Sequence, residues 1–158
     1  MPTPYPLQIN EFSFEFTTDQ GISYCGYFKS AGYLFDDYPV LAPSIFTFDL
    51  LVQHGDPSAV LADLRIGCTV AEILGIFFQN NSFSVVYLCD SVDGFHFARM
   101  RLFNYWFWKY ANEDIVKRDN IATSLGIQIQ NSLLIHRDNP QFDQVIAAFE
   151  DLNAELDK

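Results

Sequence analysis

The chain has 158 residues, of which 49% are hydrophobic and 16% aromatic, and its formal net charge is −11. This length and apolar content allow one domain with a packed core and exclude a disordered chain. Only 9 basic residues stand against 20 acidic ones, so neither nucleic acid nor an anionic membrane is an expected partner.

The start of the chain and its cysteines indicate where the protein resides. Residues 1–10 are expected to form a loose N-terminal arm and do not resemble a secretory leader. Cys25, Cys68 and Cys89 lie in apolar stretches without CxxC spacing, which is typical of reduced, buried thiols. We therefore expect a cytoplasmic protein.

Three strands are predicted in the first third of the chain. Phe12, Phe14 and Phe16 alternate with polar residues, as in a strand with one buried face. A turn at residues 19–21 predicts a returning strand over residues 22–28. After a broken loop, residues 45–52 form the third strand.

A helix is expected next. Thr69 and Glu72 have the spacing of a capping box, which places the helix start at Thr69. The residues that follow form one apolar stripe up to Asn80, and this stripe should pack on the sheet. The stripe consists of Val70, Ile73, Leu74, Phe77 and Phe78.

Residues 85–89 are apolar without alternation, so this strand should be covered on both faces and lie parallel to the third strand. Residues 95–111 then form a helix with two apolar stripes, which requires a second packing surface besides the sheet. That surface could be the last helix, or a homodimer partner contacting Tyr105, Trp106 and Trp108.

The remaining elements are two strands, near residues 115–122 and 127–136, joined around residues 124–126. A last amphipathic helix begins near Asn139 and Pro140. The expected order is βββ-α-β-α-ββ-α. It predicts a single α+β domain over residues 1–158, with a mixed, mostly antiparallel sheet and helices on both faces.

One polar cluster is the candidate binding site. Where a strand of a parallel pair ends and a helix follows, backbone N–H groups and the side chains at the strand end face a crevice. The alternative, which we favour, is that the same residues cap helices and form structural ion pairs. The candidates are Arg65, Gly67, Thr69, Asp90, Asp93, Arg99 and Arg101.

The sequence offers no catalytic or metal-binding motif. His54, His96 and His136 lie far apart and lack a metal-ligand spacing, and no serine has the context of a nucleophile. We therefore assign no catalytic residue, no metal and no resident cofactor.

The stretch YLCDSVDGFHFARMRLFNYWF, together with FSFEFTTDQGISY and DLRIGCTVAEIL, resembles a family of short bacterial proteins known only as a domain of unknown function. The resemblance covers about residues 12–108. It implies a stand-alone bacterial protein and supplies no activity. The family pattern is an aspartate-rich turn, an arginine-bearing helix and a Trp-Phe pair, matched here by Asp90, Asp93, Arg99, Arg101, Trp106 and Phe107.

The element order is also similar to the core of the acyl-CoA-dependent N-acyltransferases. That resemblance implies acyl-CoA as a cofactor, with its pyrophosphate at a helix N-terminus. The corresponding place here begins with Arg65 but lacks the paired glycines, and Leu102 and Phe103 stand where those enzymes often carry a tyrosine.

The leading hypothesis is a non-enzymatic binding or interaction module with an acidic surface that serves a protein partner or self-association. Two alternatives stay open. One is an acyltransferase-like enzyme, and the other is an immunity or antitoxin-like inhibitor that uses the charge of −11 against a basic toxin.

Overall fold

The computed structural model describes residues 2–90, 96–110 and 112–156 of the chain. Its helices are α1 (Leu64–Phe77), α2 (His96–Tyr110) and α3 (Phe142–Leu156), with short 3-10 turns η1 (Gly32–Leu34), η2 (Ala42–Ser44) and η3 (Pro57–Ala59). The strands are β1 (Gln8–Ile9), β2 (Ser13–Thr17), β3 (Ser23–Ser30), β4 (Ile45–His54), β5 (Ser84–Asp90), β6 (Ile115–Ser124) and β7 (Ile127–His136).

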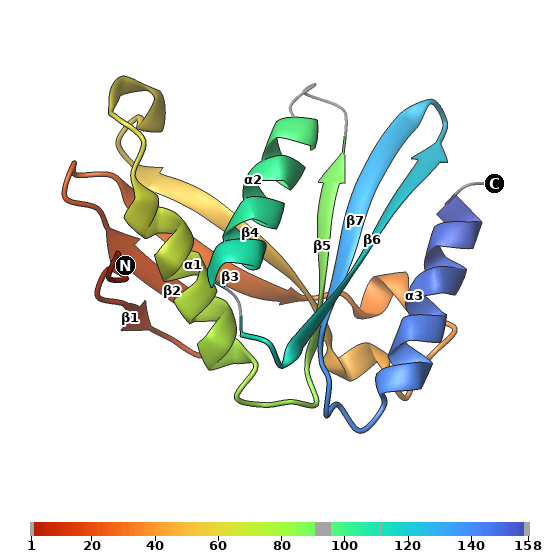
Figure 1. Ribbon diagram of the computed structural model, residues 1–158. Helices are drawn as coiled ribbons and strands as arrows, with labels where there is room; N and C mark the ends of the chain where they lie inside the picture. Colours follow the sequence, from red (N-terminus) through yellow and green to blue (C-terminus); the bar gives the residue numbers. More distant parts are fainter. Residues whose placement is uncertain (1, 91–95, 111, 157–158) are drawn as a thin grey trace.

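These strands form one mixed sheet in the order β1-β2-β3-β4-β5-β7-β6, and the predicted α+β class is confirmed (Figure 1). The only parallel neighbours in the described sheet are β4 and β5, as the right-handed crossover through α1 predicts. They pair only at residues 45–47 and 84–86, although β4 continues to His54 and β5 to Asp90. The two strands therefore separate toward their C-terminal ends.

Helices cover both faces of the sheet, and a core lies on each side. On one face α1 and α2 pack on the phenylalanines of β2, β3 and β4, where the rings of Phe28 and Phe77 stack with centroids 3.8 Å apart. On the other face α3 packs through Val145 and Phe149. Strand β5 supplies Val85 to the first core and Val86 to the second, so it is covered on both faces as expected.

The β6–β7 hairpin matches its predicted position. Its turn has positive φ angles at Leu125 (51°) and Gly126 (79°), the conformation of a two-residue hairpin turn that follows the twist of the strands. Among the described helices, none combines the length and apolar character needed to span a bilayer.

Three expectations are wrong. Residues 2–10 do not form a loose arm, because Tyr5 is buried and Gln8–Ile9 pairs with β2 as an edge strand. Helix α1 begins at Leu64 and not at Thr69. The last helix does not supply the second packing surface of α2, since α3 lies on the opposite face of the sheet (Figure 1); that surface is α1.

Candidate functional site

Helix α1 is capped by a carboxylate. Asp63 has extended backbone angles, and its Oδ1 accepts a hydrogen bond from the Arg65 amide at 2.9 Å. An aspartate at this position satisfies an amide that the helix itself leaves without a partner, and its charge suits the positive end of the helix dipole. The first turn of α1 is therefore already occupied by an anionic group of the chain itself.

Tyr5 ties the N-terminal arm to this first turn. Its side chain is only 4% exposed, and its ring stacks on Phe16. Its hydroxyl donates to Asp63 Oδ2, and its amide donates to Thr69 Oγ1 at 2.9 Å. Burial raises the pKa of Tyr5, and the neighbouring Asp63 carboxylate adds to the rise, so the hydroxyl keeps its proton at neutral pH.

Arg65 holds the arm from the other side. Its guanidinium lies 3.7 Å from the centre of the Tyr5 ring, in the geometry of a cation–π contact. The same group donates to the carbonyl of Thr3 at 2.7 Å and forms an ion pair with Asp19 at 3.1 Å. In this arrangement Arg65 fastens the arm.

Gly67 is a point of close contact between α1 and α2. A Cβ atom at this position would lie 2.3 Å from Cδ1 and 2.5 Å from Nε1 of Trp106. No side chain other than hydrogen fits there without displacing the indole. Gly67, one of the three predicted site residues at this end of α1, thus serves helix packing.

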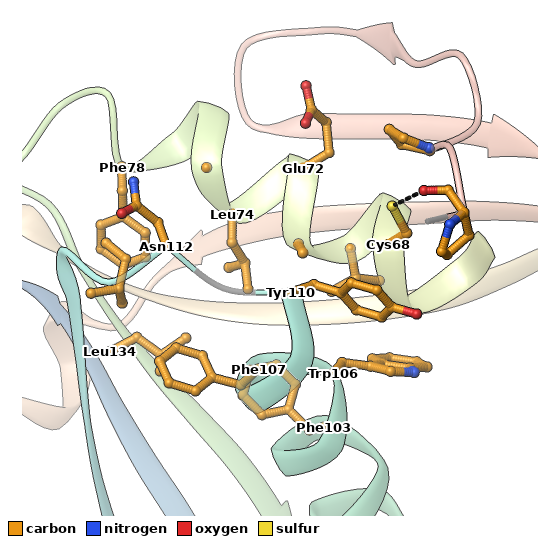
Figure 2. A pocket seen from close by; sticks show the side chains of 16 residues that line it. Cys68, Glu72, Leu74, Phe78, Phe103, Trp106, Phe107, Tyr110, Asn112 and Leu134 are labelled. Carbon is orange, nitrogen blue, oxygen red and sulfur yellow. Dashed lines mark hydrogen bonds between the residues drawn. The ribbon is translucent and has the colours of Figure 1, made fainter. Parts of the chain in front are cut away.

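A cavity of about 320 Å³ lies between α1, α2 and the arm (Figure 2). Its size falls at the lower end of the range for small-molecule sites. Its polar side chains are those of Cys68, Glu72, Tyr110 and Asn112. The rest of the lining is apolar or glycine: Pro2, Pro4, Val70, Ala71, Leu74, Gly75, Phe78, Phe103, Trp106, Phe107, Ile115 and Leu134.

Cys68 lies where the arm closes this cavity. Figure 2 shows its sulfur directed at the carbonyl of Pro2, to which it donates at 3.2 Å. Burial raises the pKa of the Cys68 thiol, and Glu72 raises it further. The sulfur therefore carries its proton at neutral pH, which suits a donor and not a nucleophile.

Two smaller cavities flank the first. One, of about 270 Å³, lies between the start of α1 and the α2 residues Leu102 and Tyr105. The other, of about 250 Å³, lies where β4 and β5 separate, beneath Phe103. Trp106 lines both of them as well as the cavity of about 320 Å³.

The structure does not bring the seven predicted site residues into one described cluster. Arg65, Gly67 and Thr69 share the first turns of α1 and act on the arm and on α2. Arg101 is exposed on α2, and the backbone of Asp90 ends β5 opposite Ile129. Asp93 lies outside the described residues, as do the side chains of Asp90 and Arg99.

The predicted interface residues divide into two groups. Trp108 is 83% exposed and Tyr105 44% exposed, so both are available to a partner. Trp106 is partly buried, packs against Gly67 of α1 and lines the cavity wall; its role in a dimer interface stays a prediction.

Sequence reasoning missed most of the cavity, above all the arm residues Pro2 and Pro4. One signal was present. The two apolar stripes of α2 require two packing surfaces, and Phe107 and Tyr110 belong to the stripe that reaches the cavity. Nothing in the local sequence of the arm indicates that it closes this space.

The fold and this helix-walled cavity define a small α+β protein with a mostly apolar cavity between two helices. A family model described as "Family of unknown function (DUF6169)" matches residues 62–151 of the 158-residue chain. The chain therefore belongs to this family, and the resemblance to a domain of unknown function is confirmed. Searches of curated proteins and of solved structures gave no significant match.

Proposed function

We propose that this protein is a non-enzymatic binding module that holds a small apolar molecule between α1 and α2. The observation that carries the proposal is the cavity of about 320 Å³, which has a mostly apolar lining and few polar groups. Small-molecule sites are typically concave and mostly apolar with a few polar groups, and they often lie between helices.

Acyl transfer is the alternative that the separation of β4 and β5 favours, because it opens a cavity of about 250 Å³ at the C-terminal ends of parallel strands. Two observations speak against it. The Asp63 carboxylate already accepts from the Arg65 amide at the start of α1, where a pyrophosphate would bind. The Arg65 guanidinium is already engaged with the arm and with Asp19.

We propose a cytoplasmic location. The free thiols of Cys25 and Cys68 support it, since unpaired cysteines fit a reducing compartment. A protein partner is the second candidate ligand, favoured by the exposed indole of Trp108. The inhibitor of a basic toxin stays a prediction that rests on the charge of −11 alone.

The two tryptophans of the chain allow a direct test of the proposed site. In the Trp108→Phe variant, Trp106 in the cavity wall is the sole tryptophan and reports on the site by its fluorescence. Titration with 1-octanol, an uncharged apolar probe, should change its emission with saturation. The Trp106→Phe variant leaves only the exposed Trp108, and its emission should not respond.

Two further results complete the test. An emission change that is equal in both variants, or absent in the Trp108→Phe variant at millimolar probe, would contradict the proposed site. Acetyl-CoA, tested by thermal shift, should leave the melting temperature unchanged. A rise in melting temperature with acetyl-CoA would favour the acyltransferase alternative instead.

A further inference from the structure

We infer that the three cavities are compartments of one elongated site for an uncharged hydrocarbon chain, and that Trp106 divides them and sets the chain length bound. This inference rests on the proposed function and adds to it the class of the ligand and the residue that determines specificity.

Each pair of cavities has lining residues in common, and one residue lines all three. Phe103 lines the cavities of about 320 and 250 Å³, and Leu102 lines those of about 270 and 250 Å³. Tyr110 lines the cavities of about 320 and 270 Å³. Trp106 lines all three, so its indole stands where they meet.

The indole is held in this position by α1. The absence of a side chain at Gly67 creates the space into which the edge of the ring fits, and an added Cβ would come within 2.9 Å of three ring atoms. In Figure 2 Trp106 lies below Tyr110, on the side of the cavity away from Leu134. A smaller side chain at position 106 would remove the common wall and join neighbouring compartments.

The charges of the lining define the ligand class. Each cavity has one carboxylate at its edge, that of Glu72, Asp63 or Asp49 respectively, and Glu72 and Asp49 are exposed to solvent. None of the lining residues that the structure describes is a lysine, arginine or histidine. A buried anionic head would find no cation to pair with it among the described lining residues. The apolar lining without such a cation therefore fits an uncharged hydrocarbon and disfavours fatty acids and acyl phosphates.

The test measures the affinity of 1-alkanols of increasing length by displacement of Nile red, a neutral apolar dye. In the unmodified protein, each added methylene should improve affinity about fourfold until one compartment is full, after which affinity should level off. In Trp106→Leu the improvement should continue to longer chains. Trp108→Leu, the same change at the exposed tryptophan, is the matched control and should level off where the unmodified protein does.

Each outcome decides between the hypotheses. If affinity levels off at the same alkanol length in Trp106→Leu and in the unmodified protein, the dividing role of Trp106 is refuted, while the proposed binding function still stands. If no alkanol displaces the dye from any variant, the proposed function itself fails. Should Trp106→Leu not fold, Trp106→Phe keeps a ring against Gly67 and should extend the length limit by a smaller step. Alkyl carboxylates that bind as tightly as alkanols of equal length would overturn the ligand class.

Discussion

Gly67 and Trp106 form the contact that sets the distance between α1 and α2. Glycine inside a helix lowers helix stability by roughly 0.5–1 kcal/mol relative to alanine. At Gly67 this loss is offset by packing of the Trp106 indole, because the ring lies in the space that a Cβ atom would fill. Gly75, in the same helix, has open space around the position of a Cβ.

These two glycines predict opposite effects of the same substitution. Gly67→Ala should lower the free energy of unfolding by about 1–3 kcal/mol, since the indole or the helices must move. Gly75→Ala should raise it by up to about 1 kcal/mol through helix propensity alone. Urea denaturation measures both. An equal effect at the two positions would show that the indole does not rest against Gly67.

The Tyr5 hydroxyl predicts a loss of stability at high pH. Because its pKa is raised in the folded protein, the unfolded chain releases this proton first. The stabilisation is complete below the ordinary tyrosine pKa of about 10 and is lost as the pH rises through the folded value. Tyr5→Phe should make the decline in unfolding free energy above pH ~10 less steep.

Other groups with raised pKa values, such as Tyr24 and Cys25, will keep part of this decline in the Tyr5→Phe variant. The comparison is therefore between slopes measured by denaturant titration at several pH values. Tyr33→Phe removes an exposed hydroxyl and serves as the matched control. Identical slopes for Tyr5→Phe and the unmodified protein would contradict a raised pKa of Tyr5 in the folded protein.

At the scale of elements, the arm and α1 form one unit. The amide of Tyr5 is buried and finds its acceptor in Thr69 Oγ1, which in turn donates to the Arg65 carbonyl at 2.6 Å. The arm therefore depends on a hydroxyl in the helix interior, and Cys68 adds a second attachment one residue earlier. Arm and cavity should respond together to changes in this helix.

Thr69→Val tests this dependence. Valine has the shape of threonine but leaves the Tyr5 amide without an acceptor, which should destabilise the protein by about 1–3 kcal/mol. Hydrogen exchange at the Tyr5 amide should become faster. Thr69→Ser keeps the hydroxyl and should retain the protection; loss of protection in both variants would mean that packing of the methyl group, and not the hydrogen bond, holds the arm.

At the scale of the whole molecule, the charge of −11 opposes association between copies. Salt of about 0.15 M shortens the range of this repulsion to about 8 Å. The exposed indole of Trp108 is the apolar group most available for a contact between copies on α2.

We expect self-association through Trp108 to appear with added salt and high protein concentration. Size-exclusion chromatography with light scattering should then give a mass above that of the 18.1 kDa chain, and Trp108→Glu should restore the monomer mass. Trp106→Phe should associate like the unmodified chain, since that ring packs inside. A monomer mass under all conditions would remove the dimer hypothesis.

Local patterns were sufficient for most of the fold. The alternating phenylalanines, the apolar run at residues 85–89 and the hairpin turn near Gly126 each impose a period or a backbone angle that few structures satisfy. They predicted the strands, the parallel pair and the helices on both faces. At the candidate site, the sequence singled out Arg65, Gly67, Thr69 and Trp106 and favoured structural roles for the cluster, but it did not indicate their partners.

The start of α1 shows why local patterns have a limit. Thr69 and Glu72 match a capping box, but Asp63 also has the chemistry of an N-cap, and the sequence holds both. Tyr5 decides between them, because its amide takes the Thr69 hydroxyl and its own hydroxyl meets Asp63. These partners lie more than fifty residues apart, so no window of sequence contains the answer.

The amino-acid sequence by itself determined the element order, the α+β class and the two-sided helix α2, since side-chain periodicity and turn chemistry act over a few residues. Only the tertiary structure decided that the arm is fixed, that α2 pairs with α1, and that space for a ligand remains between them. The physical reason is that a cavity consists of what side chains from distant segments fail to fill. That depends on how closely the helices approach, which Gly67 and Trp106 set together.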